Sequence, residues 1–142
     1  MEIIRRPLDR MDAGWLPILV PAERRVLAKM RWRGVAVDGR EFGFELIEPL
    51  GHGTPVFAAA GQVYVIAQRA EPVFRIPIAD AAEGGRIGWM VGNLHFPAQI
   101  VGGAILVETD EAVRQLLVRE GIGFSEESAV FQPIRAHAGH RH

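Results

Sequence analysis

The order of the predicted elements after residue 70 constrains the fold of this chain most. It runs strand, helix, strand, strand, helix, strand, which is the order of a ferredoxin-like sandwich. Runs of apolar residues mark the strands, and Gly102-Gly103 supplies a hairpin dipeptide between the second and the third. The strands are predicted at residues 71–78, 97–101 and 104–108, and the last one lies somewhere within residues 123–131.

Two helix-start signals separate these strands. Asp80 supplies a carboxylate cap and Glu83 follows three residues later, a pattern close to the capping box. Thr109 or Asp110 caps a second helix, which is predicted to stop at Gly121. Glycines inside the first helix each cost about 1 kcal/mol relative to alanine, so tertiary packing must hold that helix.

Short strands and turn residues fill the first half of the chain, which we expect to form a small β-domain. Residues 29–37 and 41–47 are predicted strands, and Asp38-Gly39 between them favours a tight type I′ hairpin turn. Alternation in the second strand places an apolar set on one face. That set is Phe42, Phe44 and Leu46. Further strands are predicted at residues 56–59 and 63–68.

The composition agrees with a folded α+β chain. Its 142 residues are 49% hydrophobic and 23% charged, which suffices for a core and argues against a disordered protein. There is no cysteine, which excludes disulfide scaffolds, thiolate metal sites and cysteine nucleophiles. We expect three parts: a β-rich domain over residues 1–69, a ferredoxin-like domain over 70–134 and a disordered, histidine-containing tail over 135–142.

Charge and hydropathy bound the location of the protein. The formal net charge of −1 gives no global drive toward nucleic acid or an anionic membrane. The N-terminus, MEIIRRPLDR, carries charges where a secretory signal needs an apolar core. The most apolar stretch, residues 15–22, is far shorter than the roughly 18 apolar residues of a membrane helix. We therefore expect a cytoplasmic protein without a membrane partner.

Histidines are the residues that most indicate a binding chemistry. Of the five in the chain, His137, His140 and His142 fall within the last six residues. Imidazole is the commonest protein ligand for nickel, zinc and copper, and a flexible run of histidines suits loose capture of such ions. The simpler interpretation of this cluster is an inert polar tail.

A fourth histidine lies between the first predicted helix and the strand that follows. Gly92 and Asn93 are natural C-cap residues, so His95 is expected to project from a turn at the helix end. The simpler interpretation of His95 is a structural histidine held by a hydrogen bond. The fifth, His52, lies between two glycines in a predicted loop and is not a candidate ligand.

The run GNLHFPAQ at residues 92–99 resembles the GNRHxPxQ signature of the UreE family of urease accessory proteins. Residues 31–33 and 38–43 resemble the RxR…DGxEFG hairpin of that family. Residues 110–117 are similar to its second helix, and FQP at residues 131–133, followed by histidines, to its ending. Each motif is weak by itself, but four in order at matching spacing are specific.

The resemblance implies a nickel metallochaperone that works as a homodimer. It assigns His95 to the dimer interface, where two copies meet around one Ni(II) ion, and His137, His140 and His142 to completing or exchanging the coordination. Zn(II) or Cu(II) are expected to bind the same site, since intrinsic affinity alone favours copper. Leu94 stands where the family signature has arginine, which removes a fixed cation beside the metal.

The resemblance also implies the partners. The N-terminal domain is expected to bind peptide or protein partners, here the urease apoprotein complex or the urease accessory GTPase. Basic residues on the first hairpin suit such docking. These residues are Arg31, Arg33 and Arg40.

The alternative function is a non-catalytic RNA-binding or adapter module with a ferredoxin-like domain. A basic run without an intervening acid supports it, but there is no aromatic RNA-binding strand motif. The run consists of Arg24, Arg25, Lys29, Arg31 and Arg33. The chain has no nucleophile elbow, zinc-protease helix, phosphate loop or dinucleotide fingerprint, so we expect no enzyme activity and no catalytic or cofactor-binding residues.

Overall fold

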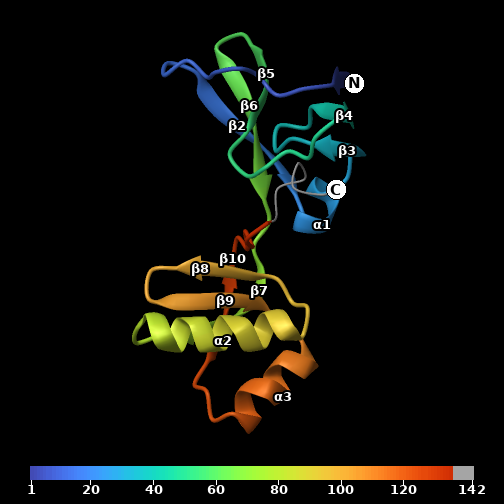
Figure 1. Cartoon of the computed structure of the whole chain (residues 1–142). Coiled ribbons are helices and arrows are strands. Elements are labelled where there is room, and N and C mark those ends of the chain that lie inside the picture. Colours follow the sequence, from blue (N-terminus) through green and yellow to red (C-terminus); the bar gives the residue numbers. More distant parts are fainter. Residues whose placement is uncertain (136–142) are drawn as a thin grey trace. The chain divides into compact units, whose positions relative to one another are not determined.

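The computed structural model describes residues 1–135 and divides the chain into two compact units (Figure 1). The first unit spans Met1–Arg69 and the second begins at Ala70. Strands and helices both occur, which confirms the predicted α+β class. The tail histidines His137, His140 and His142 lie outside the described residues.

The first unit is built from two three-stranded sheets. One has the strand order β1-β4-β3 and the other β2-β6-β5. The pairs β1–β4 and β2–β6 are parallel, and the pairs β3–β4 and β5–β6 are antiparallel. The elements are β1 (Glu2–Ile4), β2 (Leu16–Ala22), α1 (Arg24–Leu27), β3 (Arg31–Val35), β4 (Glu41–Glu45), β5 (Pro55–Ala59) and β6 (Gln62–Gln68).

Aromatic side chains form the core between these sheets. Phe42 and Phe44 of β4 are buried, as the alternation of that strand predicts. Phe44 stacks on Trp32 with ring centroids 4.0 Å apart, and Phe42 lies 5.2 Å from Tyr64 of β6. Offset and tilted aromatic pairs of this kind stabilise a core beyond their buried area.

The hairpin between β3 and β4 differs from the predicted two-residue turn. The Ala36 N–H donates to the Arg40 carbonyl at 2.9 Å, which leaves a three-residue loop between them. The Gly39 N–H donates to the Ala36 carbonyl at 2.9 Å, and within the hairpin only Gly39 has a positive φ, +94°. A type I′ turn needs a positive φ at Asp38 as well. Instead, Asp38 accepts hydrogen bonds from the Arg40 N–H at 3.0 Å and the Tyr64 hydroxyl at 2.6 Å.

These contacts make the hairpin sensitive to acid. The hydrogen bond from Tyr64, with that from the Arg40 N–H, lowers the pKa of Asp38 below its usual 3.8. A depressed carboxyl pKa contributes stability that is present above the usual value and is lost as the pH falls through the folded value.

We expect Tyr64→Phe to lower the Tm of the protein by about 4 °C near neutrality, because the buried ring loses its hydroxyl bond to a charged carboxylate. The difference from the unchanged protein should shrink in acid, as Asp38 takes up its proton. Thermal unfolding of both proteins, followed by circular dichroism near neutral pH and again in acid, checks this. An equal difference in Tm at both would show that the hydroxyl acts independently of the Asp38 charge.

Over its described residues, 70–135, the second unit is one antiparallel sheet with two helices. Its strand order is β10-β7-β9-β8. Figure 1 shows α2 lying along the sheet, and α3 follows the central strand β9 in the chain. The elements are β7 (Glu71–Pro77), α2 (Ala81–Asn93), β8 (Ala98–Val101), β9 (Ala104–Glu108), α3 (Glu111–Arg119) and β10 (Ser125–Ala129).

Each face of this sheet carries its own apolar cluster. The cluster shared with the helices combines β7 and β9 residues with residues of α2 and α3. It consists of Phe74, Ile76, Ile105 and Val107 from the sheet and Ile87, Val91, Val113 and Leu117 from the helices. On the other face Phe131 packs against Val73 and Leu106. Phe131, just after β10, therefore packs on the face of the sheet opposite the one that α2 and α3 share.

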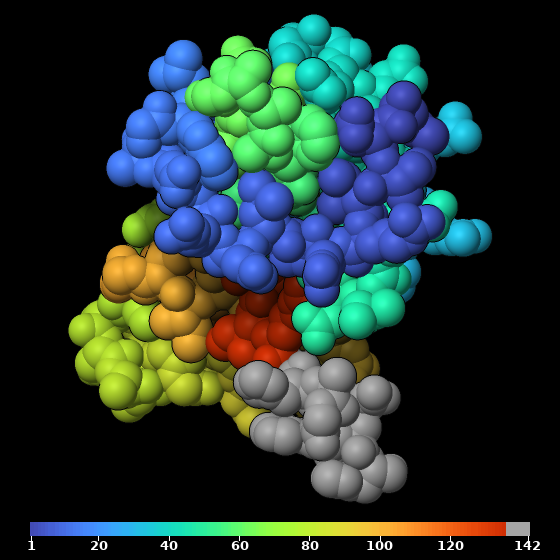
Figure 2. All heavy atoms as spheres, turned by 90° about the horizontal axis from the view of Figure 1, so that it is seen from above, coloured from blue at the N-terminus to red at the C-terminus, as the bar shows by residue number. Residues whose placement is uncertain are grey.

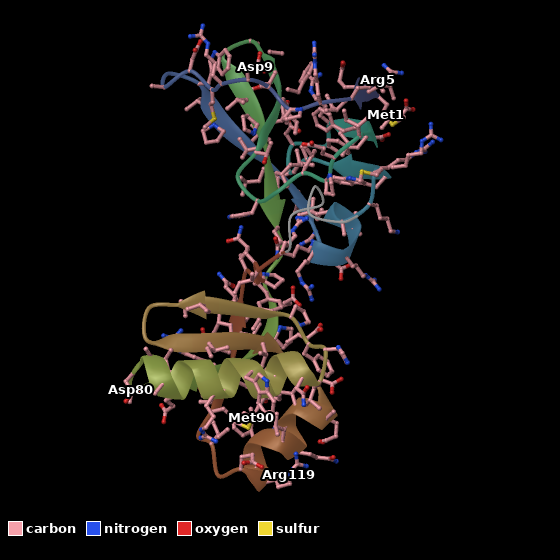
Figure 3. All side chains as sticks on the ribbon, viewed as in Figure 1. Met1, Arg5, Asp9, Asp80, Met90 and Arg119 are labelled. Atoms are coloured by element: carbon pink, nitrogen blue, oxygen red, sulfur yellow. The ribbon has the colours of Figure 1, made fainter. Side chains whose placement is uncertain are left out.

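Both helices begin where the sequence predicts. Asp80, labelled at the start of α2 in Figure 3, accepts the Glu83 N–H at 2.8 Å, and Glu83 accepts the Ala79 N–H at 2.8 Å. Asp110 caps α3 by accepting the Ala112 N–H at 2.8 Å. These bonds satisfy donors that the first helical turn leaves unpaired. In the part of the chain that the structure describes, no helix is long and apolar enough to span a membrane.

Candidate metal centre

His95 lies in the chain reversal that ends α2. The His95 N–H donates to the Gly92 carbonyl at 2.9 Å, and the Phe96 N–H donates to the Val91 carbonyl at 3.4 Å. These two bonds form a Schellman motif, in which the residue after the C-cap adopts a left-handed conformation. That residue is His95, with φ +66°.

The helix therefore ends later than predicted. Gly92 and Asn93 were expected to cap it, but α2 continues through both, and Leu94 is the C-cap. The reason lies in Phe96, which is half-buried and packs against the same apolar cluster as Val91. A contact between these two positions commonly accompanies the Schellman motif, and it sets the reversal at His95.

The left-handed conformation is unfavourable for histidine. A side chain with a Cβ atom loses roughly 1–2 kcal/mol there, whereas glycine adopts it freely. Among the described residues only Ala60 and His95 have a positive φ without being glycine. His95 is exposed, so the conformation presents the imidazole to solvent at the helix end. Strain of this kind concentrates at functional sites.

We expect His95→Gly to raise the free energy of unfolding by about 1 kcal/mol, because glycine removes the strain and an exposed imidazole contributes little packing. His95→Ala is the matched control, since alanine keeps the Cβ atom and hence most of the strain. Urea unfolding followed by circular dichroism compares the two. If the glycine variant is no more stable than the alanine variant, the backbone at His95 is not strained.

One chain does not complete a metal site within residues 1–135. No group of three or more His, Cys, Asp or Glu side chains lies close enough there to hold an ion. Leu94, the residue before His95, is 37% exposed, and Trp89, six residues before His95 on α2, is 69% exposed. Contiguous exposed apolar side chains mark surfaces that meet another molecule, and Leu94 is the exposed apolar residue directly before the candidate ligand.

The remaining described histidine has a structural partner. His52 lies in the loop before β5, as predicted, and its Nδ1 accepts the Gln68 N–H at 3.0 Å. That bond ties the loop to the end of β6. His52 therefore offers a matched control for His95, because both side chains are exposed and only one ends a helix.

Comparison with known proteins places the chain in a family. A model of the UreE urease accessory protein C-terminal domain matches residues 71–142. A urease accessory protein UreE from Geobacillus kaustophilus (strain HTA426) is 32% identical over 135 residues, which cover 89% of this chain and 91% of that protein. The chain belongs to the UreE family of urease accessory proteins.

Other UreE proteins are similar at the same level. The one from Chelativorans sp. (strain BNC1) is 31% identical over 116 residues, 74% of this chain and 72% of that protein. The one from Paracoccus denitrificans (strain Pd 1222) is 29% identical over 143 residues, 98% of this chain and 85% of that protein. The family resemblance inferred from four short motifs is thus confirmed.

Membership in the UreE family settles the function class. The family consists of urease accessory chaperones, so the protein is not an enzyme, and its role belongs to urease maturation. The family implies handling of nickel in general. The RNA-binding alternative finds no support in these relatives. The matched range, residues 71–142, includes His95 and the three tail histidines.

Proposed function

We propose that this UreE-family protein is a cytoplasmic metallochaperone that binds Ni(II) and delivers it to the urease apoprotein complex during assembly of the urease active site. The observation that carries the proposal is His95, an exposed imidazole held in a left-handed conformation at the end of α2. Neutral imidazole is a suitable ligand for nickel, and a solvent-facing position allows the ion to enter and leave.

A homodimer with a shared site follows from the number of ligands. One imidazole per chain does not hold an ion tightly, but a two-fold axis close to His95 brings two together. The exposed side chain of Leu94, the residue before His95, supports an interface there. We assign His137, His140 and His142 to completing or exchanging the coordination. A site closed by a tail can open to release its ion, and Zn(II) and Cu(II) compete for it.

The two units divide the work in this proposal. The ferredoxin-like domain of residues 70–134 binds metal and forms the dimer, with the tail of residues 135–142 attached. The β-rich domain of residues 1–69 binds the urease apoprotein complex and the urease accessory GTPase. In support, the candidate ligand His95 and the exposed basic residues of the β3–β4 hairpin lie in different units.

The direct test is transfer of the ion. Protein loaded with one equivalent of Ni(II) is incubated with the apo-urease complex in the presence of a chelator that removes free nickel. We expect urease activity to appear with the loaded protein and to stay at background with the same nickel in buffer. Equal activation in both reactions would show that the protein does not deliver the ion.

A further inference from the structure

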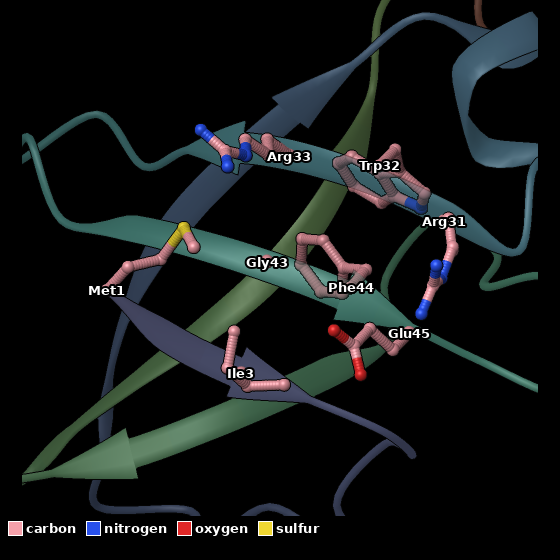
Figure 4. Close-up of a pocket in the computed structure, with 8 residues that line it drawn as sticks. All are labelled: Met1, Ile3, Arg31, Trp32, Arg33, Gly43, Phe44 and Glu45. Carbon is pink, nitrogen blue, oxygen red and sulfur yellow. The ribbon is translucent and has the colours of Figure 1, made fainter.

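The outer face of the β1-β4-β3 sheet carries a hollow that the metal chemistry does not use (Figure 4). The register places Gly43 of β4 between Ile3 of β1 and Arg33 of β3, and it pairs Glu45 with Arg31. The cavity has a volume of about 310 Å³. We call it the Gly43 hollow; its lining includes Met1, Ile3, Arg31, Arg33, Gly43 and Glu45.

Gly43 is buried and forms part of the floor of the hollow, with the side chains of Ile3 and Met1 lying close over it. A Cβ atom there would lie 3.0 Å from Ile3 Cδ1 and 3.3 Å from Met1 Cε. Both of these side chains remain open to solvent, with 62% of Met1 and 41% of Ile3 exposed. The N-terminal segment, dark blue in Figure 2, lies at the surface of the unit. The hollow therefore has an aliphatic wall that an aliphatic side chain from outside can contact.

Two guanidinium groups border the hollow without an ion-pair partner among the described residues. Arg5 neutralises Glu45 at 3.3 Å, whereas Arg31 and Arg33 form no such pair in residues 1–135. Both are exposed, and Figure 4 shows them on opposite sides of the hollow. Like-charged side chains two positions apart on a strand share a face, so their field favours an anion there.

The third arginine of this hairpin is occupied within the unit. The Arg40 Nε donates to the Tyr64 hydroxyl at 3.1 Å, and its guanidinium lies 3.6 Å from the Glu2 carboxylate. It also lies over the ring of Phe57, 5.2 Å from the centroid. Of the three arginines expected to dock a partner, the structure thus leaves Arg31 and Arg33 for that task.

We propose that the Gly43 hollow binds an extended acidic segment of a partner protein. An aliphatic side chain of the segment enters the hollow, and carboxylates two residues to either side pair with Arg31 and Arg33. Alternate residues of an extended chain face the same way, so all three side chains point at the sheet. The apolar contact supplies affinity, and the two ion pairs select an acidic partner.

The lining favours a peptide over a nucleic acid. Unpaired bases bind by stacking on exposed aromatic rings. The two aromatic residues at the hollow, Trp32 and Phe44, already stack on each other, and Phe44 is buried. The wall offered to a ligand is aliphatic, which suits a leucine or an isoleucine side chain.

This inference rests on the proposed function, because it assigns a chemistry to the partner-binding role of the first unit. Its test uses the full chain and a capped pentapeptide with glutamate at both ends, leucine in the middle and serine between them. Protein labelled with ¹⁵N and with ¹³C at isoleucine methyl groups is titrated and followed by NMR. We expect saturable shifts of the Gly43 amide and the Ile3 methyl resonances.

Variants and altered peptides separate the charges from the hollow. We expect Arg31→Glu with Arg33→Glu to weaken the peptide by about tenfold or more. The charge-matched control, Arg10→Glu with Arg25→Glu, should change binding by less than about twofold, because both residues are exposed away from the lining. Gly43→Val would press against Ile3 and Met1 and displace the aliphatic wall of the hollow. It should therefore weaken binding of the leucine peptide. A peptide with alanine in the middle binds more weakly from the start, and its affinity should not change.

Several results would overturn the inference. One is that the peptide causes no NMR shifts; another is that a peptide with lysine in place of glutamate binds equally well. A third is that the control variant Arg10→Glu, Arg25→Glu weakens peptide binding as much as Arg31→Glu, Arg33→Glu does. The last is that oligouridylate causes larger NMR shifts than the peptide. Nickel titration of the same samples separates this failure from that of the proposed function. Nickel binding without peptide binding would contradict only the proposed docking surface. Absence of nickel binding would contradict the proposed metallochaperone role.

Discussion

We expect His95→Ala to lower the affinity of the protein for Ni(II) by more than about 100-fold. Loss of a residue that merely orients a metal ligand already costs about 10–100-fold. In a two-fold symmetric site each substitution removes two ligands. We therefore take about 100-fold, the upper end of that range, as the smallest loss of nickel affinity to expect. Equilibrium dialysis against nickel at slightly alkaline pH, where imidazole is neutral, measures the change.

His52→Ala is the matched control for this experiment. It removes an exposed histidine of the first unit whose Nδ1 already accepts the Gln68 N–H. We expect it to leave nickel affinity within about twofold of the unchanged protein, since no metal contact is lost. Equal loss of affinity in both variants would mean that nickel binds to histidines without selection. Unchanged affinity in His95→Ala would make His95 a structural residue.

The second large effect is expected from removing the first unit. A chain that begins at Ala70 retains the sheet, both longer helices and the two apolar clusters of the second unit. We expect it to bind nickel within about threefold of the full chain, because no candidate ligand is lost. Urease activation in the transfer assay should fall to background, because the partner-binding surface is gone.

The double variant Arg31→Glu, Arg33→Glu serves as a finer version of the deletion. It keeps the first unit and changes only two exposed side chains. Loss of activation in both proteins would locate partner binding on the β3 side of that unit. A deletion that abolishes nickel binding instead would contradict the division of labour between the units.

Local signals in the sequence predicted most of the second unit. Asp80 with Glu83, and Asp110, act within one helical turn, so the residues that start α2 and α3 can be identified without tertiary information. The near-continuous apolar runs of β7 and β9 likewise follow from burial on both faces of a central strand. These elements therefore lie within a few residues of the predicted ranges.

The first thirty residues carried no such signal. Pro17 and Pro21 weaken the strand pattern of β2, which the structure accommodates because β2 is the edge of its sheet and pairs only with β6. The three-residue β1 forms only by parallel pairing with β4, some forty residues away. Such non-local pairing has no local pattern, so neither strand was predicted.

The candidate site shows the same division between local and tertiary information. The sequence places His95 after a helix, but Gly92 and Asn93 are better cap residues than histidine. Phe96 packs against the apolar cluster, so the helix continues through Gly92 and Asn93, and His95 adopts the left-handed conformation. An unfavourable local choice of this kind is visible only in the structure, and it is the feature that best supports a function for His95.

Nickel stoichiometry tests the central claim most directly. Calorimetric titration of Ni(II) into the full chain, with mass measured by light scattering, should show a dimer that binds one ion per two chains. A chain ending at Arg135 should keep this stoichiometry with weaker affinity, which would assign the tail histidines a supporting role. Binding of one ion per monomer, or no binding at all, would contradict a site shared by two copies of His95.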